Sequence, residues 1–173
     1  LIALDWGTTN VRAMLLDGHG DVVAEATSAD GIGSVPAGGH EAAFSRLVAD
    51  WPAVPAIMAG MVGSRQGWRE AVYVECPASP EAIAEGILRL EDAGGRPIAI
   101  VPGVMVRSPD RDGDVLRGEE TQVVGLLAGD PDFDGVVVLP GTHSKWATVT
   151  DGAIADFQTF LAGEVFGLLS RQS

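Results

Sequence analysis

Residues 7–18 of the chain read GTTNVRAMLLDG, and residues 141–152 read GTHSKWATVTDG. Aligned without a gap, the two stretches share the Gly-Thr pair at the start, an alanine in the middle and the Asp-Gly pair at the end. Each follows a short apolar run, IALDW or VVVLP, and leads into an alternating run that closes on an Asp-Gly hairpin turn. We therefore expect each stretch to form a strand, a tight Gly-Thr turn, a second strand, a hairpin and a third strand.

The repetition predicts two related halves that face each other across a cleft. A glycine followed by small hydroxyl residues presents backbone N–H groups and hydroxyls with no bulky side chain in the way, which suits a phosphate. Facing turns would then hold the two ends of a polyphosphate, whereas the alternative is a pair of ordinary hairpins with similar turns. The candidate phosphate-binding residues are Gly7, Thr8, Thr9 and Asn10 in the first turn, and Gly141, Thr142, His143, Ser144 and Lys145 in the second.

Length, charge and composition narrow the class of protein. A chain of 173 residues with 46% hydrophobic content is large enough to bury a core. Its 11 basic and 24 acidic side chains give a formal charge of −13, which argues against a nucleic-acid partner. An acidic protein that binds a polyanion needs Mg²⁺, backbone N–H groups and a few placed cations; the alternative is that the acidity only keeps the protein in solution.

Two further absences in the sequence bear on location and on metals. No apolar run approaches the length of about 20 residues that spans a bilayer, so no membrane partner is expected. The single cysteine, Cys76, fits a reducing cytoplasm. The three histidines are not at metal-ligand spacing, which argues against a zinc site.

The order of predicted elements indicates an α/β fold. Three antiparallel strands are followed by helix, strand, helix, strand and helix, which is the wiring of a ribonuclease-H-like half-domain with a mixed five-stranded sheet flanked by helices. We expect a complete first domain at 1–130 and the start of a second, duplicated one at 131–173, as in the N-terminal part of a longer protein. The predicted strands are 1–5, 11–17, 21–27, 56–61 and 97–101. The predicted helices are 40–51, 80–92 with Pro80 at its first position, 118–129 and 163–171, and 102–117 is predicted as an irregular excursion.

Asp5 ends the apolar strand IALD, immediately before the first Gly-Thr turn. A carboxylate there is costly unless it has a partner, and we predict that it holds a hydrated Mg²⁺ opposite the phosphates. The alternative is that it caps the turn by accepting hydrogen bonds from the N–H groups of Gly7 or Thr8. The aligned position of the second copy is Leu139.

Glu119 and Glu120 open the helix predicted at 118–129. Carboxylates in a first turn are favoured by the helix dipole alone. The functional alternative is a general base that takes the proton from an attacking hydroxyl during phosphoryl transfer. Adjacent helical residues point in different directions, so only one faces the cleft, and we favour Glu120.

Cations that could bind a ligand are few. Lys145 is the only lysine in the chain, and it either contacts a phosphate or is a solvated strand residue; His143 either donates to a phosphate or lies in the loop. Arg65 lies in a Gly-rich loop, GMVGSRQGW, and could clamp a carboxylate in bidentate fashion. Arg107 is a second candidate and Arg111 or Arg117 a third, with surface solvation as the alternative for each. The sequence contains neither a GxxxxGK[ST] loop nor a GxGxxG fingerprint.

Five segments, LDWGTTNVRAMLLD, GMVGSRQGW, RGEETQVVGLL, LPGTHSKW and DFQTFLAGEVFGLL, together resemble the 2-dehydro-3-deoxygalactonokinase family of the sugar-kinase, actin and hexokinase superfamily. LDWGTTN is similar to the superfamily's first phosphate motif and LPGTHSKW to its second, although Leu139 and Pro140 stand where an acidic residue is usual. RGEETQ resembles the motif that carries the catalytic acidic residue in related carbohydrate kinases, where Asp is commoner. The match is ambiguous by one position between Glu119 and Glu120.

The resemblance implies ATP- and Mg²⁺-dependent phosphorylation of the 6-hydroxyl of 2-dehydro-3-deoxy-D-galactonate in galactonate breakdown. It implies a small-molecule sugar acid and a nucleotide as partners, a cytoplasmic location and an adenosine pocket largely outside this chain, and it leaves a homodimer open. The rivals are another carbohydrate kinase of the same fold, including one for the gluco epimer, and a non-catalytic actin-like ATP-binding module. The sugar-acid-binding residues that it implies are Gly63, Ser64, Arg65, Arg107 and Glu164.

Overall fold

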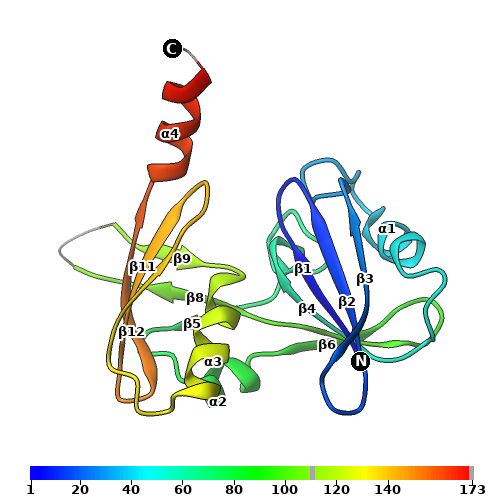
Figure 1. The fold of residues 1–173 in the computed structure, drawn as a ribbon, viewed down its shortest axis with the longest axis horizontal. Helices are drawn as coiled ribbons and strands as arrows, with labels where there is room; N and C mark the ends of the chain where they lie inside the picture. The colour runs from blue at the N-terminus through cyan, green and yellow to red at the C-terminus, as the bar shows by residue number, and fades with distance from the viewer. Residues whose placement is uncertain (110–111, 172–173) are drawn as a thin grey trace.

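The computed structural model describes residues 1–109 and 112–171, which form two lobes side by side (Figure 1). The first lobe is built on a six-stranded mixed sheet of order β3-β2-β1-β4-β7-β6. Its central strands β1 and β4 are parallel, as are β4 and β7, whereas β1–β2, β2–β3 and β6–β7 are antiparallel. The strands are β1 (Ile2–Trp6), β2 (Val11–Leu16), β3 (Val22–Ser28), β4 (Ala56–Gly60), β6 (Leu88–Glu91) and β7 (Pro97–Ile100).

The mixed sheet with flanking helices agrees with the fold predicted from the sequence, but it has six strands where five were expected. The additional strand β6 lies in the segment predicted as the end of a helix, which in fact stops at α2 (Pro80–Glu85). Leu88 and Leu90 pack on the core while Arg89 and Glu91 are exposed. This alternation fits a half-buried edge strand rather than a helix.

The second lobe contains two three-stranded sheets and the helix that faces the first lobe. β5 (Tyr73–Glu75), β8 (Gly103–Val106) and β9 (Asp114–Leu116) form one sheet, although 102–117 was predicted to be irregular. The reason is that Val104, Val106 and Leu116 are buried, so this Pro-, Asp- and Arg-rich segment still carries an apolar face. β10 (Gly135–Leu139), β11 (Ser144–Thr150) and β12 (Ala153–Phe160) form the other sheet, which is the strand–turn–strand–hairpin–strand unit predicted for the second copy.

The buried apolar side chains form two cores. The first lies between the six-stranded sheet and α1 (His40–Leu47), whose Phe44 is fully buried against it. The second surrounds α3 (Glu119–Gly129), whose Val123 and Leu127 pack with residues of both sheets of the second lobe. The chain moves between the cores more than once: Ala78 and Ile83 belong to the second, Ile98 and Ile100 to the first, and buried apolar residues from Val101 on to the second. The domain limits 1–130 and 131–173 remain a prediction.

The last helix, α4 (Ala162–Arg171), projects from the second lobe (Figure 1). Its apolar side chains are largely uncovered, with Phe166 73% and Leu169 68% exposed. Among the helices in the described ranges, none combines the length and the apolar character that a bilayer crossing requires.

Candidate active site

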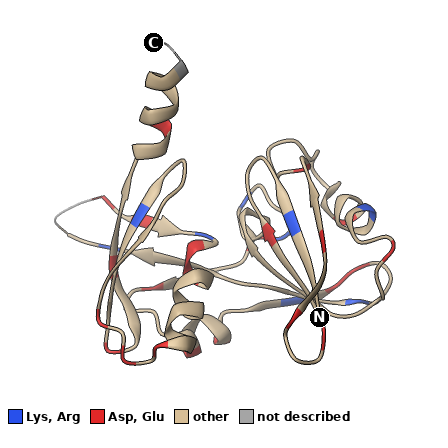
Figure 2. Cartoon of the chain, in the orientation of Figure 1, with Lys and Arg blue, Asp and Glu red and all other residues tan. Residues whose placement is uncertain are grey.

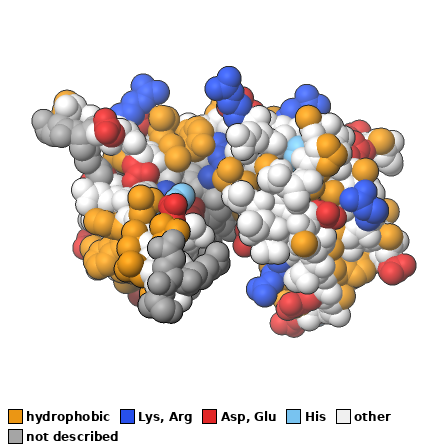
Figure 3. Space-filling view, turned by 90° about the horizontal axis from the view of Figure 1, so that it is seen from above, with side chains coloured by type: hydrophobic (Ala, Val, Ile, Leu, Met, Phe, Trp, Pro, Cys, Tyr) orange, Lys and Arg blue, Asp and Glu red, His pale blue; other side chains and the backbone are white. Residues whose placement is uncertain are grey.

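A cleft of about 450 Å³ lies between the lobes and is lined by residues from both of the repeated turns. Gly7 and Thr8 come from the turn after β1, and Gly141 and Thr142 from the turn after β10. The space-filling view shows the furrow between the lobes (Figure 3). The two turns therefore face one shared hollow, which is the arrangement that the sequence repeat predicts.

The first turn is held in place by the loop that follows β3. Gly7 N–H donates to Asn10 O (2.9 Å), Gly7 O accepts from Ile32 N–H (3.0 Å), and Thr8 O accepts from Gly33 N–H (2.9 Å). A Cβ at Gly31 would lie 2.2 Å from the carbonyl carbon of Thr9, so this loop needs glycine to pack directly on the turn. The turn is thus braced by hydrogen bonds and packing within the first lobe.

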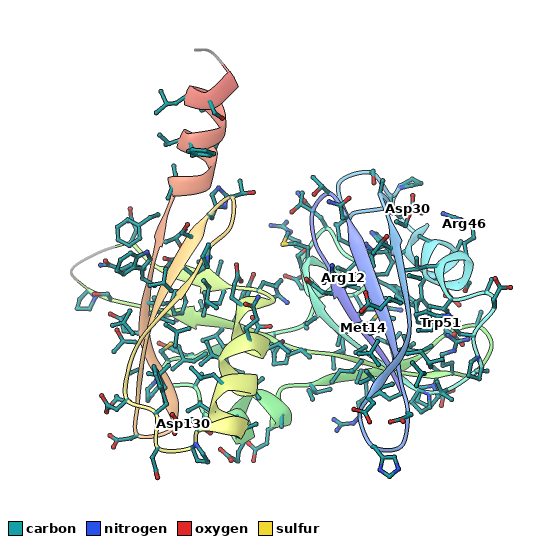
Figure 4. The ribbon with its side chains drawn as sticks, in the orientation of Figure 1. Arg12, Met14, Asp30, Arg46, Trp51 and Asp130 are labelled. Carbon is teal, nitrogen blue, oxygen red and sulfur yellow. The ribbon has the colours of Figure 1, made fainter. Side chains whose placement is uncertain are left out.

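The supporting loop is itself tied to the first lobe. Trp6 Nε1 donates to Asp30 O (2.8 Å), and Arg46 of α1 lies 3.4 Å from the Asp30 carboxylate (Figure 4). Thr9 and Asn10 do not line the interlobe cleft. They line a neighbouring open hollow of about 560 Å³, which also reaches Asp5 and Gly7. The structure therefore divides the predicted first phosphate turn between two hollows.

The second turn is braced by the start of α4. Thr142 O accepts from Glu164 N–H (2.9 Å), and a Cβ at Gly163 would lie only 2.1 Å from Gly141 O. His143 lines the cleft, and its Nε2 lies 3.3 Å from Glu164 Oε2. Glu164 was predicted to bind substrate, but it does not line the cleft itself and pairs instead with a residue that does. Ser144 is buried in β11 and also lies outside the cleft lining.

Lys145 lines the cleft, but its ammonium group is held by the second lobe. The Nζ donates to Val115 O (2.7 Å) and to Thr159 Oγ1 (2.7 Å), and it lies 3.7 Å from Asp114 Oδ1. Thr159 Oγ1 in turn donates to Asp114 Oδ1 (2.7 Å). With Lys145 only 8% exposed, the alternative of a solvated strand residue does not describe it.

The two glutamates of α3 occupy different environments, and they do so in the opposite sense to the one predicted. Glu119 lines the cleft, and its Oε2 accepts from Arg117 N–H (3.0 Å). Glu120 is fully buried and does not line the cleft. The reason is helical spacing: the inward face of α3 is set by Val123 and Leu127, which follow Glu120 by one and two turns.

The carboxylate of Glu120 accepts hydrogen bonds from its neighbours at the N-terminus of α3. Its Oε2 accepts from Gly118 N–H (2.7 Å) and its Oε1 from Thr121 Oγ1 (3.3 Å). Burial raises the pKa of Glu120 to about 7, and the neighbouring Glu119 carboxylate contributes in the same direction. Gly118 has φ 112°, and a Cβ there would lie 3.2 Å from Gly60 Cα, so glycine lets the start of α3 approach the end of β4.

Asp5 presents an exposed carboxylate to the cleft from the end of β1. Among the described residues, Asp5 accepts no hydrogen bond from the N–H of Gly7 or of Thr8, and Gly7 N–H donates to Asn10 O instead, so the alternative role as a cap of the turn is not observed. In the described part of the chain, no group of three or more His, Cys, Asp or Glu side chains is placed to hold a metal. A single carboxylate suits Mg²⁺, which usually keeps waters and binds one or two carboxylates together with substrate phosphates.

Arg65 and Arg107, the first two arginines predicted to bind a carboxylate, do not line the cleft. Arg65 is exposed and does not line it, although its neighbour Ser64 does. Arg107 is also exposed and lies 3.9 Å from Glu75, and Arg111 is outside the described residues. Among the arginines that the structure describes, the one that lines the cleft is Arg117, which was also a predicted candidate.

Arg117 was only a third candidate among the arginines considered for the carboxylate. Tyr73, which also lines the cleft, was not predicted. A signal for Arg117 was present, since it stands two residues before the helix that carries the glutamates. Charge is otherwise spread over both lobes, and the described residues form no continuous basic stripe (Figure 2). The expected absence of a nucleic-acid partner stays a prediction, because the distribution of charge does not test it.

A family model described as 2-keto-3-deoxy-galactonokinase matches residues 5–173. The chain is 40% identical over 174 residues to a protein of Rhizobium meliloti (strain 1021) named probable 2-dehydro-3-deoxygalactonokinase DgoK1, covering 99% of this chain and 56% of that one. It is 38% identical to the 2-dehydro-3-deoxygalactonokinase of Escherichia coli (strain K12), covering 57% of that protein. A crystal structure from Sinorhizobium meliloti, described as a candidate 2-dehydro-3-deoxygalactonokinase, superposes with TM-score 0.87 at 39% identity and is covered to 57%. The chain thus spans little more than half the length of these relatives.

Proposed function

Because the chain belongs to the 2-keto-3-deoxy-galactonokinase family, we propose that the full-length protein transfers the γ-phosphoryl group of ATP to the 6-hydroxyl of 2-dehydro-3-deoxy-D-galactonate. The bond between the γ-phosphorus and the bridging oxygen breaks, a new phosphorus–oxygen bond forms to the sugar acid, and ADP leaves. The observation that carries the proposal is that both Gly-Thr turns, Asp5, Glu119 and Arg117 line one cleft. The names of the relatives support the choice of substrate.

The turns are suited to the phosphates of the nucleotide. Thr8 lines the cleft from one side and Gly141 and Thr142 from the other, so threonine hydroxyls and backbone N–H groups other than that of Gly7 can meet the phosphates. Positioning with charge neutralisation is most of what phosphoryl transfer needs. Asp5 would hold Mg²⁺, which when bound supplies neutralisation of the phosphate charge. Residues 1–130 would form the first domain and 131–173 the start of the second, with the adenosine pocket beyond the matched part of the relatives.

Glu119 is the better candidate for the base, because it is the glutamate that lines the cleft. Its carboxylate would take the proton of the 6-hydroxyl as the oxygen attacks phosphorus. Glu120 would act indirectly, by fixing Gly118 and the start of α3. Glu119→Gln should lower kcat by roughly 10²–10⁴-fold with little change in either KM, while Glu120→Gln should keep most of the rate. The reverse result would return the base to Glu120.

A coupled ADP-release assay on the full-length protein tests the function. The acceptors are the 2-keto-3-deoxy acids derived from galactonate and from gluconate, and neutral sugars. We expect release that depends on the galactonate-derived acid. Release with neutral sugars only would indicate another carbohydrate kinase, and ATP binding without release on any acceptor would indicate the non-catalytic module. Cytoplasmic location and a homodimer stay predictions.

A further inference from the structure

The guanidinium of Arg117 is fixed at the wall of the cleft by groups from one short segment. Its Nε donates to Tyr73 Oη (3.1 Å), its Nη2 donates to Ala71 O (3.0 Å), and its Cζ lies 4.2 Å from the centroid of the Tyr73 ring. Ala71 is tied in turn to the loop after β4, because its N–H donates to Gly63 O (2.9 Å). Three of the five N–H groups of the guanidinium remain for other partners.

The charge of Arg117 has no counterion among the residues that the structure describes. Within residues 1–109 and 112–171, the carboxylates that form ion pairs do so with other cations, and none pairs with Arg117. Its Nη1 is buried and has no hydrogen-bond partner within residues 1–109 and 112–171. Buried charges in proteins are usually paired, since an unpaired one carries a large desolvation penalty. An anion supplied by a ligand would complete this site.

A second polar group without a partner lies in the same corner of the cleft. Ser64 is 8% exposed, its Oγ is buried and forms no hydrogen bond, and the residue lines the cleft with Arg117. Gly63 joins the two, because a Cβ at this position would lie 2.7 Å from Arg117 Nη1. The absence of a side chain at Gly63 thus lets the guanidinium lie against the backbone next to Ser64.

The lysine of the cleft already has hydrogen-bond partners and, unlike Arg117, an ion-pair partner among the described residues. Lys145 donates to Val115 O and Thr159 Oγ1 and lies close to Asp114. Among the described residues, the side-chain hydrogen bonds of Arg117 go to Tyr73 and Ala71 and none goes to either Gly-Thr turn. Its anion is therefore expected on the acceptor side of the cleft, away from the groups suited to the nucleotide phosphates.

We propose that Arg117 and Ser64 form the subsite that binds the carboxylate of the sugar acid, and that Tyr73 positions the guanidinium. The proposal rests on the kinase function proposed above. It replaces Arg65 and Arg107 as carboxylate ligands and makes Arg117 the residue that selects acids over neutral sugars. A planar guanidinium suits a carboxylate better than an ammonium does, because it donates two parallel N–H bonds.

The test uses the full-length protein and measures KM separately for the sugar acid and for ATP. Arg117→Met should raise the sugar-acid KM by about 10²-fold, since truncating one partner of a buried charge pair costs a few kcal/mol, and leave the ATP KM almost unchanged. It should also abolish the preference for the acid over an analogue whose carboxylate is reduced to an alcohol. Ser64→Ala should raise the sugar-acid KM by roughly tenfold. Arg69→Met, an exposed arginine of the same loop, is the matched control and should change neither KM.

The outcomes separate this inference from the function on which it rests. A wild-type protein without acid-dependent turnover would overturn both. A wild-type protein with such turnover, whose Arg117→Met and Ser64→Ala variants keep the sugar-acid KM, would overturn the carboxylate subsite alone. So would a rise confined to the ATP KM, which would assign the anion to a nucleotide phosphate, or a rise caused by Arg65→Met instead. If Arg117→Met does not fold, Arg117→Lys and Ser64→Ala decide by the same two KM values.

Discussion

At the start of α3 two adjacent glutamates show how one helical step separates two chemical roles. Glu119 faces the cleft and Glu120 faces the core, because Val123 and Leu127 fix the inner face of the helix. A motif alone leaves their order open, since either residue matches an acidic position at a helix start. What decides is the direction of the apolar stripe that follows, and that stripe is visible in the sequence.

The buried carboxyl of Glu120 makes a prediction about stability. Burial raises its pKa from 4.5 to about 7, so between these pH values the native state binds more protons than the unfolded state. The stabilisation contributed by the Glu120 carboxyl is therefore fully present below about pH 4.5 and is lost as pH rises through 7. This loss lowers the free energy of unfolding by about 3 kcal/mol at most. Urea unfolding from pH 5 to 8 should show the wild type losing stability relative to Glu120→Gln as pH rises.

The comparison with Glu120→Gln is needed because His40 acts in the opposite sense. Burial lowers the pKa of His40, so its contribution to stability increases with pH. Glu25→Gln, at an exposed position of β3, is the matched control and should keep the wild-type pH dependence. A constant difference in unfolding free energy between wild type and Glu120→Gln across this pH range would contradict the prediction.

Gly63 gives a second prediction at the scale of one residue. A Cβ at this position would lie 2.7 Å from Arg117 Nη1 and 2.9 Å from Ile100 Cγ2. Gly63→Ala should therefore displace the guanidinium, destabilise the fold by about 1–3 kcal/mol and raise the sugar-acid KM. Gly125→Ala is the control: this exposed glycine of α3 has no atom within 4 Å of an added Cβ, and the change should stabilise by up to about 1 kcal/mol. If Gly63→Ala and Gly125→Ala had equal unfolding free energies, the steric crowding predicted at Gly63 would be wrong.

At the scale of elements, the sequence repeat predicted both strand–turn–strand units, because glycine, threonine and the Asp-Gly hairpins are local signals. It did not predict β5, β6, β8 and β9. Each of these strands is three or four residues long, and such a short run is shaped by the neighbouring strand that it pairs with rather than by its own pattern. The position of Arg117 was missed for the same reason, since it directly follows β9.

The contact between β9 and the β11–β12 pair carries a prediction of its own. Lys145 binds Val115 and Thr159 and lies close to Asp114 in a largely buried polar cluster. The strand β9, which carries Asp114 and Val115, leads directly to Arg117. Lys145→Met should destabilise the fold by about 2–4 kcal/mol, because it leaves a carboxylate and a carbonyl without their donor. The unfolding free energy in urea measures this.

An exposed ion pair provides the control for Lys145. Arg46 and Asp30 are paired at 3.4 Å with side chains 67% and 43% exposed, so Arg46→Met should change stability by less than about 1 kcal/mol. A Lys145→Met variant that keeps its stability but has a raised ATP KM would show that this lysine acts on a phosphate instead, as the sequence motif suggested.

At the scale of the whole molecule, the arrangement of the two lobes assigns one ligand to two distant turns. Gly7 and Gly141 are 134 residues apart in the sequence (141 − 7), yet both line the interlobe cleft. If both grip one triphosphate, each lobe contributes to the same binding event and the effects of changes in the two turns must be coupled. Independent hairpins, the alternative left open by the sequence, would show no such coupling.

Alanine at each turn tests this coupling, because the fold tolerates it. A Cβ at Gly7 would come no closer than 3.4 Å to Asn10 O, one at Gly141 no closer than 3.4 Å to His143 O, and neither glycine has a positive φ. Each substitution should weaken ATP binding to the full-length protein roughly tenfold by crowding the phosphates, measured by calorimetry. The double variant should depart from the sum of the single effects by more than about 0.5 kcal/mol, whereas Gly7→Ala combined with Gly125→Ala should be additive. Additive effects of the two turn substitutions would mean that the turns do not hold one triphosphate.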